Sequence, residues 1–129
     1  MLIDNKFLDR LTQEAKLSPR KRMNYDLRDS DEDASMRMIN AIEPESMIPI
    51  HRHRDTSEDV ICIRGKVAEL LFDDKGNEVA RYLLLPGSDS CACHVPLGQY
   101  HTCRSLESGS AIIEFKNGKY NPITTEDIL

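Results

Sequence analysis

The chain has 129 residues, 40 % of them hydrophobic, which is enough for one domain with a buried core and too few for two. Its net charge of −5 excludes the basic excess of a typical nucleic-acid-binding protein, so we expect no nucleic-acid partner. No apolar run is long enough to span a bilayer, and the first residues lack the basic and apolar regions of a secretory signal. We therefore expect a cytoplasmic protein with no membrane partner.

One amphipathic helix is expected at residues 4–17. Asp4 can cap its start, and Pro19 disfavours its continuation. Apolar side chains recur there at three- and four-residue steps, the spacing of one helix face: Phe7, Leu8, Leu11 and Ala15. The following residues, 18–35, are polar and rich in charge, and we expect them to be irregular. Residues 1–35 are therefore predicted to form an N-terminal helix and an irregular extension.

From Met36 onward the pattern changes to short β-rich pieces separated by turn residues such as Pro86-Gly87 and Ser108-Gly109. Strands are predicted near 36–43, 46–53, 58–64, 66–73, 78–85, 90–95, 100–105 and 110–116. Many short strands with no helices between them indicate an antiparallel sandwich or barrel. Residues 36–129 are thus predicted to be a single all-β domain.

The histidines of this β-rich region form a candidate metal site. His51 and His53 are two residues apart, so in an extended strand both imidazoles project from the same face. Glu58 follows after a short polar turn that lets the next strand return beside them. His101 begins a distant strand that can supply a fourth ligand. We predict His51, His53, Glu58 and His101 as the metal ligands.

Three neutral imidazoles and one carboxylate suit one divalent transition metal ion per chain, with Zn²⁺, Fe²⁺, Ni²⁺, Mn²⁺ and Co²⁺ as the candidates. Such a set leaves coordination positions open for water or a small-molecule ligand. The four cysteines offer a second possibility, because Cys91 and Cys93 share one face of a strand and can form a soft-metal pair. We favour the alternative that the cysteines pack as small core residues.

Two segments resemble the motifs of the cupin superfamily. His51-Arg52-His53, Glu58 and Gly65 resemble the first motif, and Gly87 with Pro96-Leu97-Gly98-Gln99-Tyr100-His101 resembles the second. The resemblance implies a jelly-roll β-barrel with a metal ion inside it, bound by the four residues named above. Two features depart from the family pattern. The interval from Gly87 to Pro96 is longer than usual, and Ser105 stands where asparagine is common.

Further segments are similar to the WbuC-type cupin fold metalloproteins. They include Ser18–Tyr25, Asn40–Pro44, Ile48–His53 and Glu114–Gly118. Those proteins are associated with bacterial surface-polysaccharide (O-antigen) gene clusters, and their reaction is not established. The resemblance therefore implies a sugar or sugar nucleotide as the small-molecule ligand.

Several further residues are candidates for the pocket or for substrate binding. Cys103 shares the face of its strand with His101, whereas Tyr100 adjoins His101 on the opposite face. Polar residues in or before the early strands can reach the pocket rim, where an arginine suits a carboxylate or phosphate. The full set is Arg22, Asn24, Arg37, Asn40, Tyr100 and Cys103.

Three functions are consistent with these residues. The first is a metal-dependent sugar isomerase, epimerase or lyase, in which the metal acts as a Lewis acid. The second is an Fe(II)-dependent oxygenase, and the third is a non-catalytic, metal-dependent carbohydrate-binding module. No general acid or base can be assigned, so the catalytic residues stay unknown. The exposed sheet edges of a jelly roll of this size also predict a homodimer.

Overall fold

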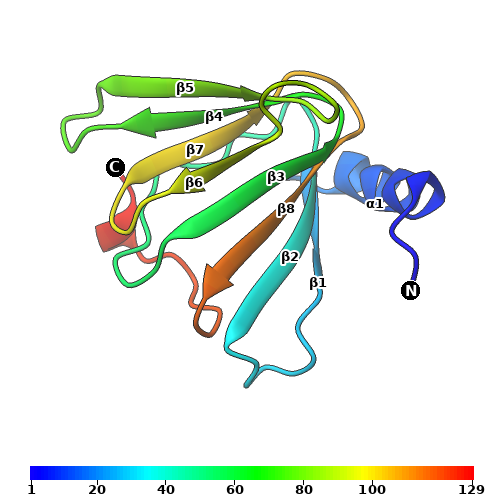
Figure 1. The fold of residues 1–129 in the computed structure, drawn as a ribbon, viewed down its shortest axis with the longest axis horizontal. Coiled ribbons are helices and arrows are strands. Elements are labelled where there is room, and N and C mark those ends of the chain that lie inside the picture. The colour runs from blue at the N-terminus through cyan, green and yellow to red at the C-terminus, as the bar shows by residue number, and fades with distance from the viewer.

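The computed structural model describes residues 1–129 as one helix and eight strands in two antiparallel sheets (Figure 1). The first sheet has the order β1-β2-β8-β3-β6 and the second has the order β5-β4-β7. The elements are α1 Asn5–Leu17, β1 Arg22–Asp26, β2 Ser35–Ile42, β3 Glu58–Arg64, β4 Val67–Phe72, β5 Glu78–Leu84, β6 Ala92–Val95, β7 Tyr100–Ser105, β8 Ser110–Asn117 and a 3₁₀ turn at Thr125–Asp127. This architecture confirms the predicted all-β jelly roll with a short N-terminal helix. No helix is long and apolar enough to cross a membrane.

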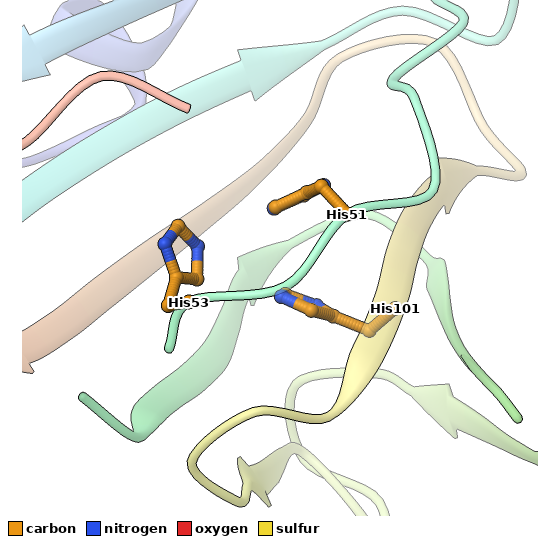
Figure 2. A group of neighbouring side chains, drawn as sticks. All are labelled: His51, His53 and His101. Carbon is orange, nitrogen blue, oxygen red and sulfur yellow. The ribbon is translucent and has the colours of Figure 1, made fainter. Parts of the chain in front are cut away.

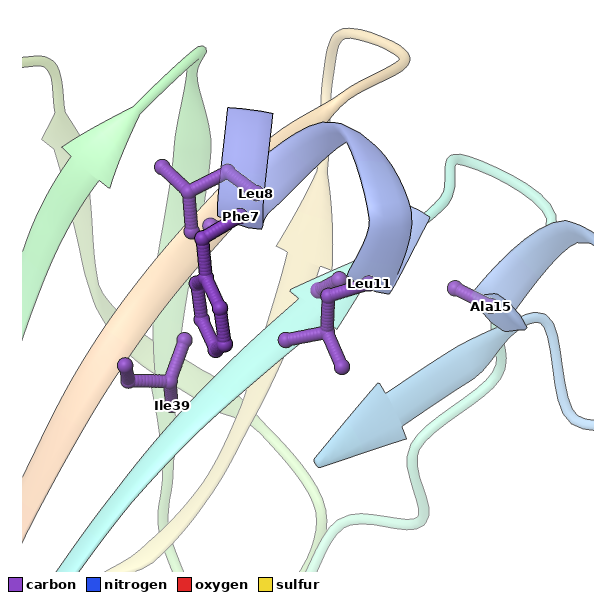
Figure 3. Packing of buried hydrophobic residues seen from close by; sticks show 7 residues of the cluster. Phe7, Leu8, Leu11, Ala15 and Ile39 are labelled. Carbon is purple, nitrogen blue, oxygen red and sulfur yellow. The ribbon is translucent and has the colours of Figure 1, made fainter. Parts of the chain in front are cut away.

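The N-terminal helix covers the outer face of the five-stranded sheet. The side chain of Asp4 caps α1 by accepting a 3.0 Å hydrogen bond from the backbone N–H of Phe7, as the sequence predicts. Figure 3 shows the apolar side of the helix facing β2, where Phe7 lies beside Ile39. The whole cluster comprises Phe7, Leu8, Leu11, Ala15, Ile39, Ala41 and Ala111. Each buried Phe or Leu side chain contributes about 1.5–3 kcal/mol, so this face anchors the helix against the sheet.

A second apolar cluster lies between the two sheets. It comprises Ile42, Val60, Cys62, Val67, Leu84, Cys103 and Ile112. Along β8 the alternate positions after Ile112 are Glu114 and Lys116, and Glu58 is the register partner of Lys116. The space between the sheets is therefore apolar toward the start of β8 and polar toward its end.

Strand β1 was not expected, because residues 18–35 read as a polar, irregular segment. It pairs with β2 from Arg22 opposite Ile42 to Asp26 opposite Met38. As the edge strand of its sheet it is half-buried to exposed, so a polar composition does not prevent pairing. The predicted boundary between residues 1–35 and 36–129 stays a prediction. Strand β1 lies before that boundary, although it pairs with β2.

The strand predicted at 46–53 is wrong. This stretch is extended but forms no ladder, and only His51 makes isolated bridges, to His101 and Ile128. Pro49 has no N–H to donate, and the carbonyl of Ile48 accepts hydrogen bonds from side chains of β7 instead of from a strand. The segment therefore runs antiparallel beside β7 and carries His51 and His53 to the polar end of the core.

Candidate metal centre

Three histidines from two distant parts of the chain converge at the polar end between the sheets (Figure 2). His51 and His53 lie on the segment before β3, whereas His101 lies on β7, and one ligand atom of each lies within 4.8 Å of the others. The backbones of His51 and His101 exchange hydrogen bonds of 3.0 and 2.8 Å. The N–H of Gly98 donates to the carbonyl of His53 at 2.8 Å. The backbone therefore fixes both halves of the cluster relative to each other.

Glu58, the first residue of β3, places a buried carboxylate beside these imidazoles. Its Oε2 atom lies 3.3 Å from Nε2 of His53 and 3.6 Å from Nε2 of His101. The Nζ atom of Lys116, its register partner on β8, lies 3.7 Å from the same oxygen. The structure thus brings together all four residues that the sequence singles out as ligands.

Several polar atoms at this point have no hydrogen-bond partner although they are buried. They include Nε2 of His53, Oε2 of Glu58 and Nε2 of His101. An unpaired buried polar atom costs about 1–3 kcal/mol, so such atoms are rarely left without a function. A divalent cation accepts electron pairs from imidazole nitrogens and carboxylate oxygens at the same time. The residues present therefore fit a transition metal ion.

Partners behind two of the histidines fix which nitrogen faces the cluster. Nδ1 of His51 lies 2.8 Å from the carbonyl oxygen of Pro49, and Nδ1 of His101 lies 2.5 Å from Oε1 of Glu69. With Nδ1 engaged, Nε2 of each ring remains for the cation. A carboxylate or carbonyl behind a ligating histidine is the usual way in which proteins orient such a ligand.

Glu69→Gln is expected to weaken metal binding by about 10–100-fold without removing a ligand, because the outer partner of His101 becomes a poorer acceptor. Competition with a chromophoric chelator measures this affinity. Glu107→Gln is the control, since that carboxyl group plays no part in the cluster. Equal affinities for the parent and Glu69→Gln proteins would show that Glu69 does not support the site.

Burial keeps the histidines uncharged at neutral pH. It lowers the pKa of His51 to about 3 and that of His53 to about 4, and it also lowers the pKa of His101. Burial raises the pKa of Glu69 well above its usual range. Neutral imidazoles are the form that binds metal ions, so these rings need no deprotonation at pH 7.

The metal-free protein is expected to lose stability as the pH falls from about 6.5 to 5. In this window His51 and His53 take up protons in the unfolded chain but stay neutral in the folded one, because their folded pKa values lie near 3 and 4. Protons therefore favour unfolding. The contribution of both residues to the stability of the folded state is complete above pH 6.5. Thermal unfolding in EDTA measures the effect, and His53→Ala is expected to flatten the profile. A parent Tm that does not change across this window would contradict the pKa shifts.

A cavity of about 150 Å³ adjoins the histidines. Of the predicted pocket residues, Arg22, Asn40 and Cys103 line it. The other three lie elsewhere: Asn24 donates to the sulfur of Met38, Arg37 pairs with Asp33, and the ring of Tyr100 lies under the guanidinium of Arg52. Asn24 is held by Met38 of the neighbouring strand, and Arg37 lies three positions before Asn40 on β2 and so on the opposite face. Tyr100 follows the alternation of β7, which directs it away from His101.

The cavity also contains residues that sequence reasoning missed. They are Glu69, Glu114, Lys116, Tyr120, Asn121, Ile123 and the apolar Ile48 and Ile112. Charged residues within otherwise apolar strands, such as Glu69 in β4 and Glu114 in β8, are a signal that could have identified two of them. The amide of Asn40 donates to Glu114 at 2.7 Å, and burial raises the pKa of Glu114 to about 7.

The C-terminal segment forms one wall of the cavity and is tied to the histidine segment. Asp127 pairs with Arg54 at 2.5 Å, and the N–H of Leu129 donates to the carbonyl of Ile50 at 2.9 Å. A second cavity of about 120 Å³ lies beside the first, and both are lined by His53, Lys116, Tyr120, Asn121 and Ile123. Nothing in the composition of this segment distinguishes it from a polar tail.

The fold resembles several solved structures at low sequence identity. Oxalate oxidase in complex with glycolate aligns with a TM-score of 0.66 and 15 % identity, over 83 % of this chain and 56 % of that chain. The capsular polysaccharide assembling protein CapF from Staphylococcus aureus gives a TM-score of 0.68 and 18 % identity, over 81 % of this chain and 30 % of that one. KdgF from Halomonas sp. gives a TM-score of 0.63 and 16 % identity, over 81 % and 85 %. This chain thus spans about half the length of oxalate oxidase.

These likenesses show that the chain has the cupin fold, and the three-histidine group supports a metal-binding cupin. The family model for a domain of unknown function, DUF6016, matches residues 3–84, and the chain belongs to this family. No curated protein matches the sequence.

Proposed function

We propose that this protein is a metal-dependent cupin that binds one divalent transition metal ion through His51, His53, Glu58 and His101. The observation that carries the proposal is the set of buried nitrogen and oxygen atoms that face one another with no hydrogen-bond partner. Zn²⁺, Fe²⁺, Ni²⁺, Mn²⁺ and Co²⁺ all suit this donor set. When bound, such an ion polarises a carbonyl or hydroxyl oxygen of a ligand.

The proposed ligand is a sugar or sugar nucleotide of bacterial surface-polysaccharide metabolism in the cytoplasm. The polar lining of the cavity supports this, because Asn40, Glu114 and Asn121 offer donors and acceptors for hydroxyl groups. The similarity to WbuC-type cupins and the likeness of the fold to a capsular polysaccharide assembling protein point to the same class of ligand. We propose an isomerase, epimerase or lyase activity.

Metal analysis of protein purified without added metal or an affinity tag tests the proposal. One transition metal ion per chain is expected. Zinc, nickel or manganese would favour action on sugars, and NMR of the loaded protein with sugar nucleotides would then detect turnover. Iron together with oxygen consumption would favour the Fe(II) oxygenase, and tight carbohydrate binding without turnover would favour the binding module. A protein that takes up none of these ions would contradict the metal site itself.

We also propose a homodimer formed through β5. This strand is the edge of the three-stranded sheet, and it exposes three large apolar side chains: Val79, Tyr82 and Leu83. Unpaired strand edges with apolar side chains favour association with another strand. Light scattering at working concentration measures the mass, and a monomer would contradict the proposal.

A further inference from the structure

Two cysteines of the five-stranded sheet face each other across β3 and β6, which lie side by side (Figure 1). The registered pairs of these strands end at Ile61 opposite Ala92, so the next two positions, Cys62 and Cys91, are opposite each other. The backbone confirms this alignment, because the N–H of Cys62 donates to the carbonyl of Cys91 at 2.8 Å. Both side chains therefore project from the same face of the sheet.

The separation of this pair suits a disulfide bond. Opposite residues of an antiparallel pair that share a hydrogen bond have Cα atoms about 5.5 Å apart, within the range of about 4.4–6.8 Å for disulfide-bonded cysteines. Cys93 occupies the same face of β6 but lies opposite Val60. It is thus a diagonal neighbour of Cys62, about 7–8 Å away and beyond that range. The register therefore selects Cys91 as the partner of Cys62.

The two thiols differ in their access to solvent. Cys91 is exposed, whereas the side chain of Cys62 is buried in the core, and burial raises the pKa of its thiol. The only hydrogen bond of the Cys62 thiol is a weak one, donated to the carbonyl of Arg64 at 3.4 Å. A rotation of this side chain toward Cys91 therefore breaks no strong contact. An oxidant in solution reaches Cys91 first, and Cys62 is placed to react second.

We infer that Cys62 and Cys91 are an oxidation site of this protein and form a reversible disulfide on exposure to hydrogen peroxide. The sulfur of Cys91 first attacks one peroxide oxygen, which breaks the O–O bond and leaves a sulfenic acid and one water molecule. The sulfur of Cys62 then attacks that of Cys91. The S–S bond forms, the S–O bond breaks, and the hydroxyl group leaves with the thiol proton as a second water molecule.

Together the two thiols lose two electrons, which reduce the peroxide to water. The product ties the edge strand β6 covalently to β3, and exchange with a thiol reductant restores the open form. In a reducing compartment such a bond is transient, as redox-sensing disulfides are. Neither step uses the metal ion, so the inference is independent of the proposed function.

Treatment of the intact chain with hydrogen peroxide in EDTA tests the inference, since EDTA keeps metal ions from decomposing the peroxide. The free thiols are expected to fall from four to two per chain, and a thiol reductant should restore all four. The monomer should lose the mass of two hydrogen atoms. Tryptic digestion without a reductant should link the peptide 55–64, which carries Cys62, to the peptide 82–104, which carries the other three cysteines.

Cys91→Ala is expected to abolish this link, whereas Cys93→Ala, on the same strand and the same face, is the matched control that should retain it. In Cys62→Ala protein the oxidation of Cys91 should stop at the sulfenic acid, which dimedone labels. Four free thiols after peroxide treatment, or a link that persists in Cys91→Ala protein, would overturn the inference. Loss of thiols without a link to the peptide 55–64, or a covalent dimer through Cys91, would overturn it as well.

Discussion

His101→Ala is expected to lower the affinity for the metal ion by more than about a hundredfold, because changes to the outer partners of a ligand already cost 10–100-fold. The imidazole of His101 is almost fully buried and is the only proposed ligand from the distant strand β7. Its removal opens the cluster and leaves the carboxyl group of Glu69 without its partner. The metal content measured by mass spectrometry should fall from one ion per chain to almost none.

His94→Ala is the matched control for this loss. His94 lies on β6, where its exposed ring bonds to Asp59 at 2.7 Å, outside the cluster. The same substitution there should retain one ion per chain. Thermal unfolding of both variants in EDTA separates a lost ligand from a lost fold. Retention of the ion by His101→Ala protein, or its loss from both variants alike, would show that the ion is not bound by this cluster.

Local patterns were sufficient to predict that these histidines and Glu58 lie together. His51, His53 and Glu58 are close in sequence, so their approach depends only on an extended segment and a short turn. The alternation along β7 also holds, since His101 and Cys103 both face the space between the sheets. The absence of a strand at 46–53 does not change this result, because an extended segment projects its side chains in the same way as a strand.

The rest of the cavity depends on pairings between distant strands that periodicity does not reveal. Glu114 and Lys116 reach it because β8 pairs with both β2 and β3. Arg22 reaches it through β1, a strand whose polar residues gave no β signal. The approach of the three histidines and Glu58 was therefore predictable, whereas the other charged residues of the cavity were not.

Gly65→Ala is expected to destabilise the metal-free protein by roughly 2–5 kcal/mol. Gly65 lies in the turn between β3 and β4 with φ at +79°, where an L-residue costs about 1–2 kcal/mol. A Cβ atom there would also lie 2.3 Å from Oγ and 2.7 Å from Cα of Ser110, which is completely buried. Relief of that overlap must displace the start of β8 and adds about 1–3 kcal/mol. Denaturant unfolding in EDTA measures the difference.

Gly98→Ala separates the two causes, because Gly98 has nearly the same φ, +78°, but nothing within 4 Å of the added Cβ atom. It should cost only the backbone contribution of about 1–2 kcal/mol. The hydroxyl of Ser110 accepts from the N–H of Lys66 at 3.0 Å, so displacement of β8 also breaks a bond across the turn. A larger loss of stability for Gly65→Ala would show that this glycine is required for the packing of β8 against the β3–β4 turn. Equal losses of stability in the two variants would show that Gly65 is required only for its backbone conformation.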